Sequence, residues 1–176
     1  MKLASVLLLL LAAAAWGQSD PAITGPVRAD IAAIEKAFDG KVRKVSATDP
    51  VEVMSSAQGV YLEGFGAVFT AQLDLIMTPT INPFRQKMSK QEVARVRARK
   101  LERLPVVKSL MREMLKQTAR ALSSMPEEER VVIAVSLFHF NWEDTSGLPA
   151  QIVMQAQKQK LLAQASADNA IEVQEY

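Results

Sequence analysis

Hydrophobic and polar residues alternate most regularly between residues 59 and 77. From Phe65 onward every odd-numbered residue in this segment is apolar, whereas polar side chains such as Thr70 and Gln72 occupy even-numbered positions. A period of two residues predicts a strand with one buried face and one wetter face. Gly64-Phe65-Gly66 interrupts the pattern, and we favour a bulge in one long bent strand over the turn of a hairpin.

An apolar stripe with the period of a helix runs from Ser89 to Ser123. Ser89 and Glu92 have the spacing of a capping box at its start. The phase of the stripe is kept across Pro105, which favours one long helix kinked at that proline over two helices joined by a loop. The stripe consists of Val93, Val96, Leu104, Val107, Met111, Leu115, Thr118 and Leu122.

Shorter patterns predict the remaining elements. We expect a helix from about Pro26 to Asp39-Gly40, weak strands at 41–47 and 51–54, a doubly covered central strand at 130–142, a helix at 149–165 and a short edge strand at 171–173. The order predicts an α+β or α/β fold. In it, a mixed or antiparallel sheet of four to five strands packs against one long kinked helix and two shorter helices.

The N-terminus has the order of a secretory signal peptide. Lys2 precedes the apolar run Leu3–Ala15, and Ala15-Trp16-Gly17 offers small residues at a cleavage site. An uncleaved membrane anchor is the alternative, but the run is shorter than the roughly 20 residues that span a bilayer. We therefore expect a signal peptide at 1–17, a flexible leader at 18–25 and a single globular α+β domain at 26–176.

Composition narrows the class of protein. The chain has no cysteine, which excludes disulfides, a lipidated cysteine and thiolate metal sites. Export without cysteine favours a protein of the bacterial cell envelope, either periplasmic or extracellular. No second apolar stretch is long and uncharged enough to span a membrane, and no motif implies a cofactor.

Charge is distributed unevenly along the chain. The formal net charge is +2, yet the segment from Arg85 to Arg120 holds twelve Lys and Arg against three Glu. The rest of the chain is therefore acidic. Such a division predicts either an anionic partner for the basic segment or contact between the two parts.

The basic helix is the best candidate binding surface. An anionic lipid, lipopolysaccharide, a polyanionic glycan or a protein could bind it, or it is simply a solvated face. Nucleic acid is not expected, because the chain is exported and the basic segment lacks interleaved aromatic residues. Arg97 and Lys100 fall within the apolar sector, so they either snorkel or mark a part not docked on the core. The candidate residues are Arg95, Arg99, Arg103, Lys116 and Arg120.

His139 is the only histidine and the one weak candidate for catalysis. A general base needs an orienting carboxylate, for which Glu143, Asp144 or Glu63 would serve, and a nucleophile or water within reach. No spacing in the sequence supplies that set. We favour a structural imidazole that hydrogen-bonds to the backbone near a strand end.

Four further segments receive a structural interpretation. The oxygen-rich loop at 141–146 lacks the EF-hand spacing, so turn chemistry and an N-cap are favoured over a metal site. Glu63–Gly66 is followed by strand and not by a helix, unlike a phosphate loop. Glu127–Glu129 is predicted to be a solvated loop. Residues 79–88 are predicted to be a plain connector, and the alternative is that Phe84 beside Arg85 forms a mobile lid or contacts a partner.

Two classes of function remain. The first is a non-enzymatic binding or interaction protein of the envelope, suggested by the polarised basic helix and the lack of a catalytic constellation. The alternatives are a small exported hydrolase that uses His139 with a carboxylate, and a structural or assembly protein, including a homo-oligomer formed through a sheet edge or the basic helix.

Overall fold

The computed structural model describes residues 25–45, 50–78, 88–163 and 167–176. The elements follow the chain as α1 (Arg28–Val42), β1 (Glu52–Leu62), β2 (Gly66–Asp74), α2 (Lys90–Ala121), β3 (Arg130–Leu137), β4 (Gln151–Gln157), α3 (Lys158–Leu162) and β5 (Glu172–Glu175). The five strands lie side by side in sequence order. β2 and β3 are parallel, and the other neighbouring pairs are antiparallel. This mixed sheet with one long helix confirms the predicted α+β class.

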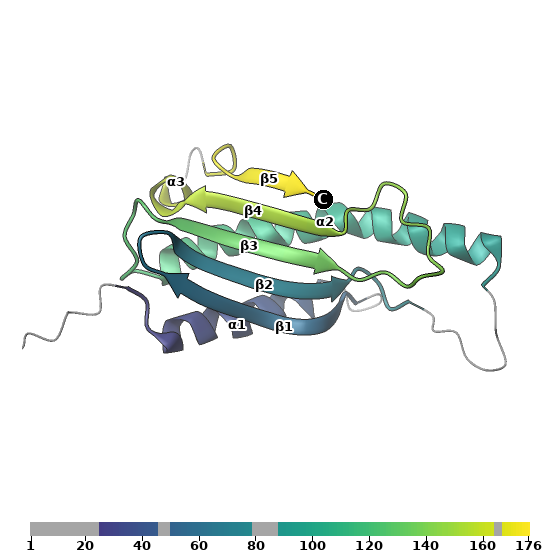
Figure 1. The fold of residues 1–176 in the computed structure, drawn as a ribbon, viewed down its shortest axis with the longest axis horizontal. Helices are drawn as coiled ribbons and strands as arrows, with labels where there is room; N and C mark the ends of the chain where they lie inside the picture. Colours follow the sequence, from purple (N-terminus) through teal and green to yellow (C-terminus); the bar gives the residue numbers. More distant parts are fainter. Residues whose placement is uncertain (1–24, 46–49, 79–87, 164–166) are drawn as a thin grey trace, which may run out of the picture.

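The two longer helices lie on one face of the sheet. Figure 1 shows α1 and α2 behind the strands, with no described helix in front of them. The core lies between, where Phe69 of β2 and Ile133 of β3 meet Met111 of α2. β3 is central, as predicted. Of the predicted cover on both its faces, the described helices α1 and α2 supply one face. Val132, on the face away from α1 and α2, is 8% exposed.

A hairpin turn, and not a bulge, separates the first two strands. β1 ends at Leu62 and pairs with β2 in antiparallel register, so the favoured interpretation of 64–66 was wrong. Gly64 has a φ of 77° and Gly66 a φ of 132°, a region in which glycine is strongly favoured. A Cβ on Gly66 would stand 1.9 Å from the carbonyl oxygen of Arg130, so the turn requires glycine there.

The irregularity in the sheet lies instead within β1. The register with β2 shifts twice between Val53 and Gln58. The Ser55-Ser56 pair lies inside this bulged strand. The weak strand predicted at 51–54 is therefore the start of a longer element.

The long helix is continuous from Lys90 to Ala121, with Pro105 inside it. Ser89 and Glu92 form the predicted capping box: the Glu92 amide donates to Ser89 Oγ at 3.3 Å, and the Ser89 amide donates to Glu92 Oε2 at 3.1 Å. The apolar stripe is buried apart from Val93, which is partly exposed. One continuous helix is thus confirmed, while the kink predicted at Pro105 stays a prediction.

A buried lysine caps the C-terminal end of α2. Lys158 Nζ donates to the carbonyls of Leu122 (2.9 Å), Ser123 (3.2 Å) and Met125 (2.5 Å). An ammonium has three N–H donors, and a positive charge is favoured at a helix C-terminus. This one side chain satisfies three carbonyls and ties the start of α3 to α2.

Two predicted elements are wrong in type. α1 continues through Gly40 to Val42, so the strand expected at 41–47 does not begin there; residues 46–49 lie outside the described residues. The helix expected at 149–165 is strand β4 followed by the short α3. Ile152, Met154 and Ala156 are buried on every second residue, a strand period that the helix prediction overlooked.

The remaining predictions divide between the described and the undescribed parts of the chain. β5 confirms the short strand near the C-terminus, at the edge of the sheet. The proposed signal peptide, all of the leader except Gly25 and the connector at 79–87 lie outside the described residues. Within those residues, no helix is both long and apolar enough to cross a membrane.

Candidate functional site

Acidic residues from other elements pair with the basic side chains of α2. Lys108 lies 2.6 Å from Glu175, and Lys116 lies 3.0 Å from Asp168. Part of the uneven charge is therefore used in ion pairs between the basic segment and the acidic rest of the chain, which is one of the two outcomes predicted. Exposed ion pairs of this kind contribute about 1 kcal/mol or less to stability. A stronger anionic partner can therefore displace the carboxylates and bind these lysines.

Lys100 neither snorkels to solvent nor lies on an undocked part of α2, the two alternatives predicted for it. Its side chain is 0% exposed, and Nζ lies 2.9 Å from Asp74 Oδ1 and 2.7 Å from Glu143 Oε2. Nζ also donates to the carbonyl of Phe138 at 3.0 Å. The lysine is thus a buried ion-pair centre that joins α2 to the carboxyl ends of the parallel strands β2 and β3.

The loop after β3 docks on α2 through Arg97. The Arg97 side chain is 36% exposed; Nε donates to the carbonyl of Ser146 at 2.8 Å and lies 3.7 Å from Asp144. The side-chain and backbone hydrogen bonds of Ser146, with the charge of Arg97, lower the pKa of Asp144. In this loop Glu143, Asp144 and the Ser146 carbonyl are engaged in ion pairs and hydrogen bonds. No group of three or more acidic or histidine residues in the described ranges has a metal-binding arrangement.

His139 lies beside the Lys100 cluster. Its Nδ1 is 3.6 Å from Glu143 Oε2, and its Nε2 is 3.4 Å from the carbonyl of Pro149. A carboxylate partner of the predicted identity is therefore present, but Lys100 already holds that carboxylate. The hydrogen bonds and ion pairs of His139 with the described residues involve Pro149 and Glu143, and no serine or threonine hydroxyl is among them. The hydrolase hypothesis stays a prediction, for which the structure supplies the histidine and a neighbouring carboxylate.

A groove between α1 and α2 brings together two of the predicted binding residues. It has a volume of about 290 Å³ and is lined by Lys41 of α1 and by Glu113, Lys116, Gln117 and Arg120 of α2. Three cations thus line the groove beside the Glu113 carboxylate, which lies 3.6 Å from Lys41, and the Lys116 ammonium also pairs with Asp168. Arg120 takes part in no ion pair with the described residues, and it lies one helical turn from Lys116.

The other three predicted residues do not line this groove. Arg95, Arg99 and Arg103 lie toward the N-terminal end of α2. With a rise of about 1.5 Å per residue, Arg103 and Lys116 are roughly 20 Å apart along the helix axis. The five candidates therefore divide into two groups on one helix.

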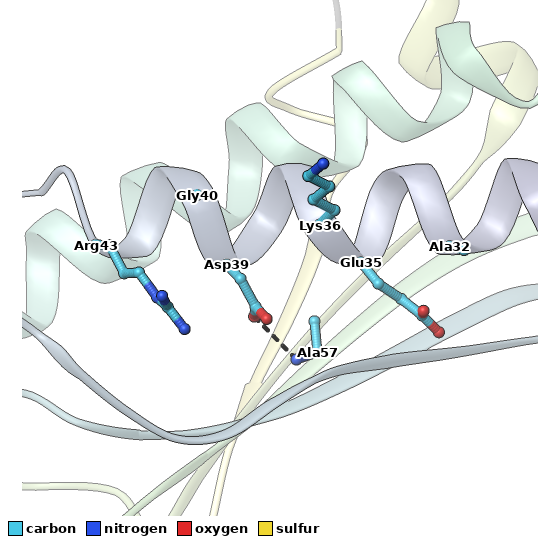
Figure 2. A pocket seen from close by; sticks show the side chains of 7 residues that line it. All are labelled: Ala32, Glu35, Lys36, Asp39, Gly40, Arg43 and Ala57. Carbon is cyan, nitrogen blue, oxygen red and sulfur yellow. Dashed lines mark hydrogen bonds between the residues drawn. The ribbon is translucent and has the colours of Figure 1, made fainter.

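A second groove, missed in the sequence, separates α1 from the edge strand β1. It measures about 500 Å³, and Figure 2 shows Glu35 and Asp39 pointing from α1 toward β1. Asp39 Oδ1 accepts from the Ala57 amide at 2.9 Å, and Glu35 Oε1 accepts from the Gly59 amide at 2.7 Å. These carboxylates occupy backbone donors that an added strand would use, which protects the edge. Their spacing of four residues on α1 was the available signal.

Glu35 also gives a testable pH dependence. The side-chain hydrogen bonds from Arg28 are the main cause that lowers the pKa of Glu35 below its ordinary 4.5. Its contribution to stability is then present above the unfolded pKa and lost as the pH falls through the lower folded value. Glu35→Gln should cost about 1 kcal/mol at pH 7 and little at pH 2. Urea unfolding at both pH values measures this; an equal cost at both would contradict it.

Glu129 corrects the prediction of a solvated acidic loop. Glu127 and Glu128 are exposed, but Glu129 is buried; its Oε1 accepts from Tyr61 Oη at 3.1 Å and from the Gly64 amide at 2.9 Å. Burial first, and then the neighbouring Glu129 carboxylate, raise the pKa of Tyr61. Glu129 therefore fixes the β1–β2 turn to the start of β3.

Comparison with known proteins identifies no relative. No protein-family model, no curated protein and no solved structure matches the chain. Its function is therefore inferred from the residues and their arrangement alone.

Proposed function

We propose that the protein is an exported, non-enzymatic binding protein of the bacterial cell envelope, which holds an anionic partner on the basic helix α2. The observation that carries the proposal is the groove lined by Lys41, Lys116 and Arg120. Among its described lining residues Glu113 is the one carboxylate, and Asp168 lies 3.0 Å from Lys116. The cations come from two helices fixed on the same face of the sheet. A partner with phosphate or carboxylate groups would find several donors within a small area.

The local charge favours an anion over a cation. The exposed pairs Lys41–Glu113 and Lys116–Asp168 are solvated, with separations of 3.6 Å and 3.0 Å. Because such pairs are weak, an incoming polyanion competes for the same ammonium groups at small cost. Arg95, Arg99 and Arg103 would extend the contact along the helix if the partner is a surface or a long chain.

The test compares two variants that remove the same charge from the same helix. Lys116→Gln with Arg120→Gln empties the groove of two cations, whereas Lys108→Gln with Arg112→Gln removes two cations that do not line it. We expect the first variant to weaken retention on vesicles containing anionic lipid about tenfold and the second to change it less than threefold. Neutralising Arg95, Arg99 and Arg103 together should also weaken it, with the fold intact.

Two arms separate the sources of the anion. Vesicles of neutral and of anionic lipid test a membrane surface, and a soluble sulfated glycan with lipopolysaccharide tests the saccharide partners. Binding should fall as salt is raised from 50 to 500 mM in any arm that is positive. Equal retention of wild type and both double variants in every arm would remove the proposal.

A further inference from the structure

The sheet face opposite the helices carries almost no charge. Along β2, β3 and β4 its residues alternate with the buried ones. Its charged members are Glu52, Arg130 and Glu172, each the first residue of its strand, while Asp74, the register partner of Glu52, is buried against Lys100 of α2. Arg130 lies 3.7 Å from Glu172, so two of these three charges offset each other. Charged residues make up 23% of the whole chain, which makes their near absence from a broad exposed face a specific property of that face.

Amides and aliphatic side chains take the place of the missing charges. One cross-strand row runs Val60, Val68, Val132 and Gln155, ending at Glu172. Val60 and Leu62 are 49% and 48% exposed. The solvated face of a sheet normally carries polar residues. Depletion of charged residues is typical of the core of a protein–protein interface. The amides of the face are Gln58, Gln72, Gln151, Gln155, Gln157 and Gln174.

We infer that this outer face is the contact between two copies of the chain, packed sheet against sheet. A glutamine amide has both donors and an acceptor, so the face is complementary to itself. A two-fold axis brings identical patches together, which a strongly charged face would resist. A distinctly acidic or basic partner, by contrast, would find no opposite charge here.

The size of the face suits such a contact. Strands about 4.8 Å apart with a rise of about 3.3 Å per residue give this five-stranded sheet roughly 500 Å² of projected area. That projection lies close to the lower limit of specific interfaces, about 600 Å² per partner. We expect aligned sheet packing and dissociation in the micromolar range. The two α2 helices would then face outward on opposite sides.

Sedimentation of the protein, purified as the producing cell makes it, tests the inference. Thr70 is exposed near the centre of the face, where Thr70→Lys would set like charges across the two-fold axis. We expect wild type to be a dimer at tens of micromolar and Thr70→Lys to raise the dissociation constant at least about tenfold. Gln72→Lys, also on the face, should act in the same direction if the first variant folds poorly.

Ser109→Lys is the matched control, because it adds the same charge at an exposed position of α2, on the helical side of the sheet. The control should sediment as wild type does. A wild-type protein that is monomeric at every concentration overturns the inference, as does a dimer that both sheet variants leave unchanged. Stoichiometric capture of a different protein by the same face overturns the second copy as the occupant.

Discussion

Replacing Lys100 with methionine is expected to lower the free energy of unfolding by about 3–5 kcal/mol. Its ammonium is fully buried between Asp74 and Glu143, whose side chains are 2% and 1% exposed. Methionine keeps most of the volume but leaves two carboxylates without a counter-charge inside the protein. Removing one partner of a buried ion pair costs far more than the pair contributes. Urea unfolding, followed by far-ultraviolet circular dichroism, measures the change.

A triple variant separates charge from packing. Lys100→Met combined with Asp74→Asn and Glu143→Gln removes all three charges and keeps the side-chain shapes, so it should be more stable than Lys100→Met alone. If the triple variant is no more stable than the single one, lost packing and not uncompensated charge explains the effect. A single variant with wild-type stability would contradict the role of Lys100 altogether.

Gly66→Ala is expected to cost at least about 3 kcal/mol, a value outside the range of ordinary surface substitutions. The new Cβ would stand 1.9 Å from the Arg130 carbonyl oxygen, and the residue has a φ of 132°. The obstacle is backbone and not a flexible side-chain end. The first residue of β2 must therefore move away from β3. Thermal unfolding and the amide spectrum of the β2–β3 pair report the loss.

Two other glycines serve as controls for Gly66. Gly64→Ala meets no atom within 4 Å but has a φ of 77°, so it should cost only about 1–2 kcal/mol of backbone strain. Gly40→Ala, inside α1 with open space around it, should stabilise the protein by up to about 1 kcal/mol. Equal losses for Gly64→Ala and Gly66→Ala would show that backbone conformation, and not the close approach, is decisive.

Local signals in the sequence were most accurate where one principle dominated. The Ser89–Glu92 capping box and the long apolar stripe fixed α2, because N-terminal capping and burial of one face act within a few helical turns. The alternation with apolar residues at odd-numbered positions in β2 was also confirmed, because burial of one face of a strand produces a period of two residues. The helix prediction for β4 failed because it overlooked the two-residue period of Ile152, Met154 and Ala156, which pairing with β3 buries.

The candidate site was only partly visible in the sequence. Lys116 and Arg120 were named, but the contribution of Lys41 depends on α1 lying beside α2. Lys100 was noted as a charge in an apolar sector, yet its partners are 26 and 43 residues away along the chain. No periodicity encodes such distances, since they depend on which strands and loops end at the same edge of the sheet.

The chain alone therefore determined its α+β class, its long capped helix, its lack of cysteine and its uneven charge, because these follow from composition and short-range spacing. Tertiary structure alone decided that the basic helix is partly neutralised by the acidic remainder, that Lys100 is an internal counter-ion, and that the described helices α1 and α2 lie on the same face of the sheet. The reason is that burial and ion pairing depend on which surfaces meet, and that is set only when the layers pack.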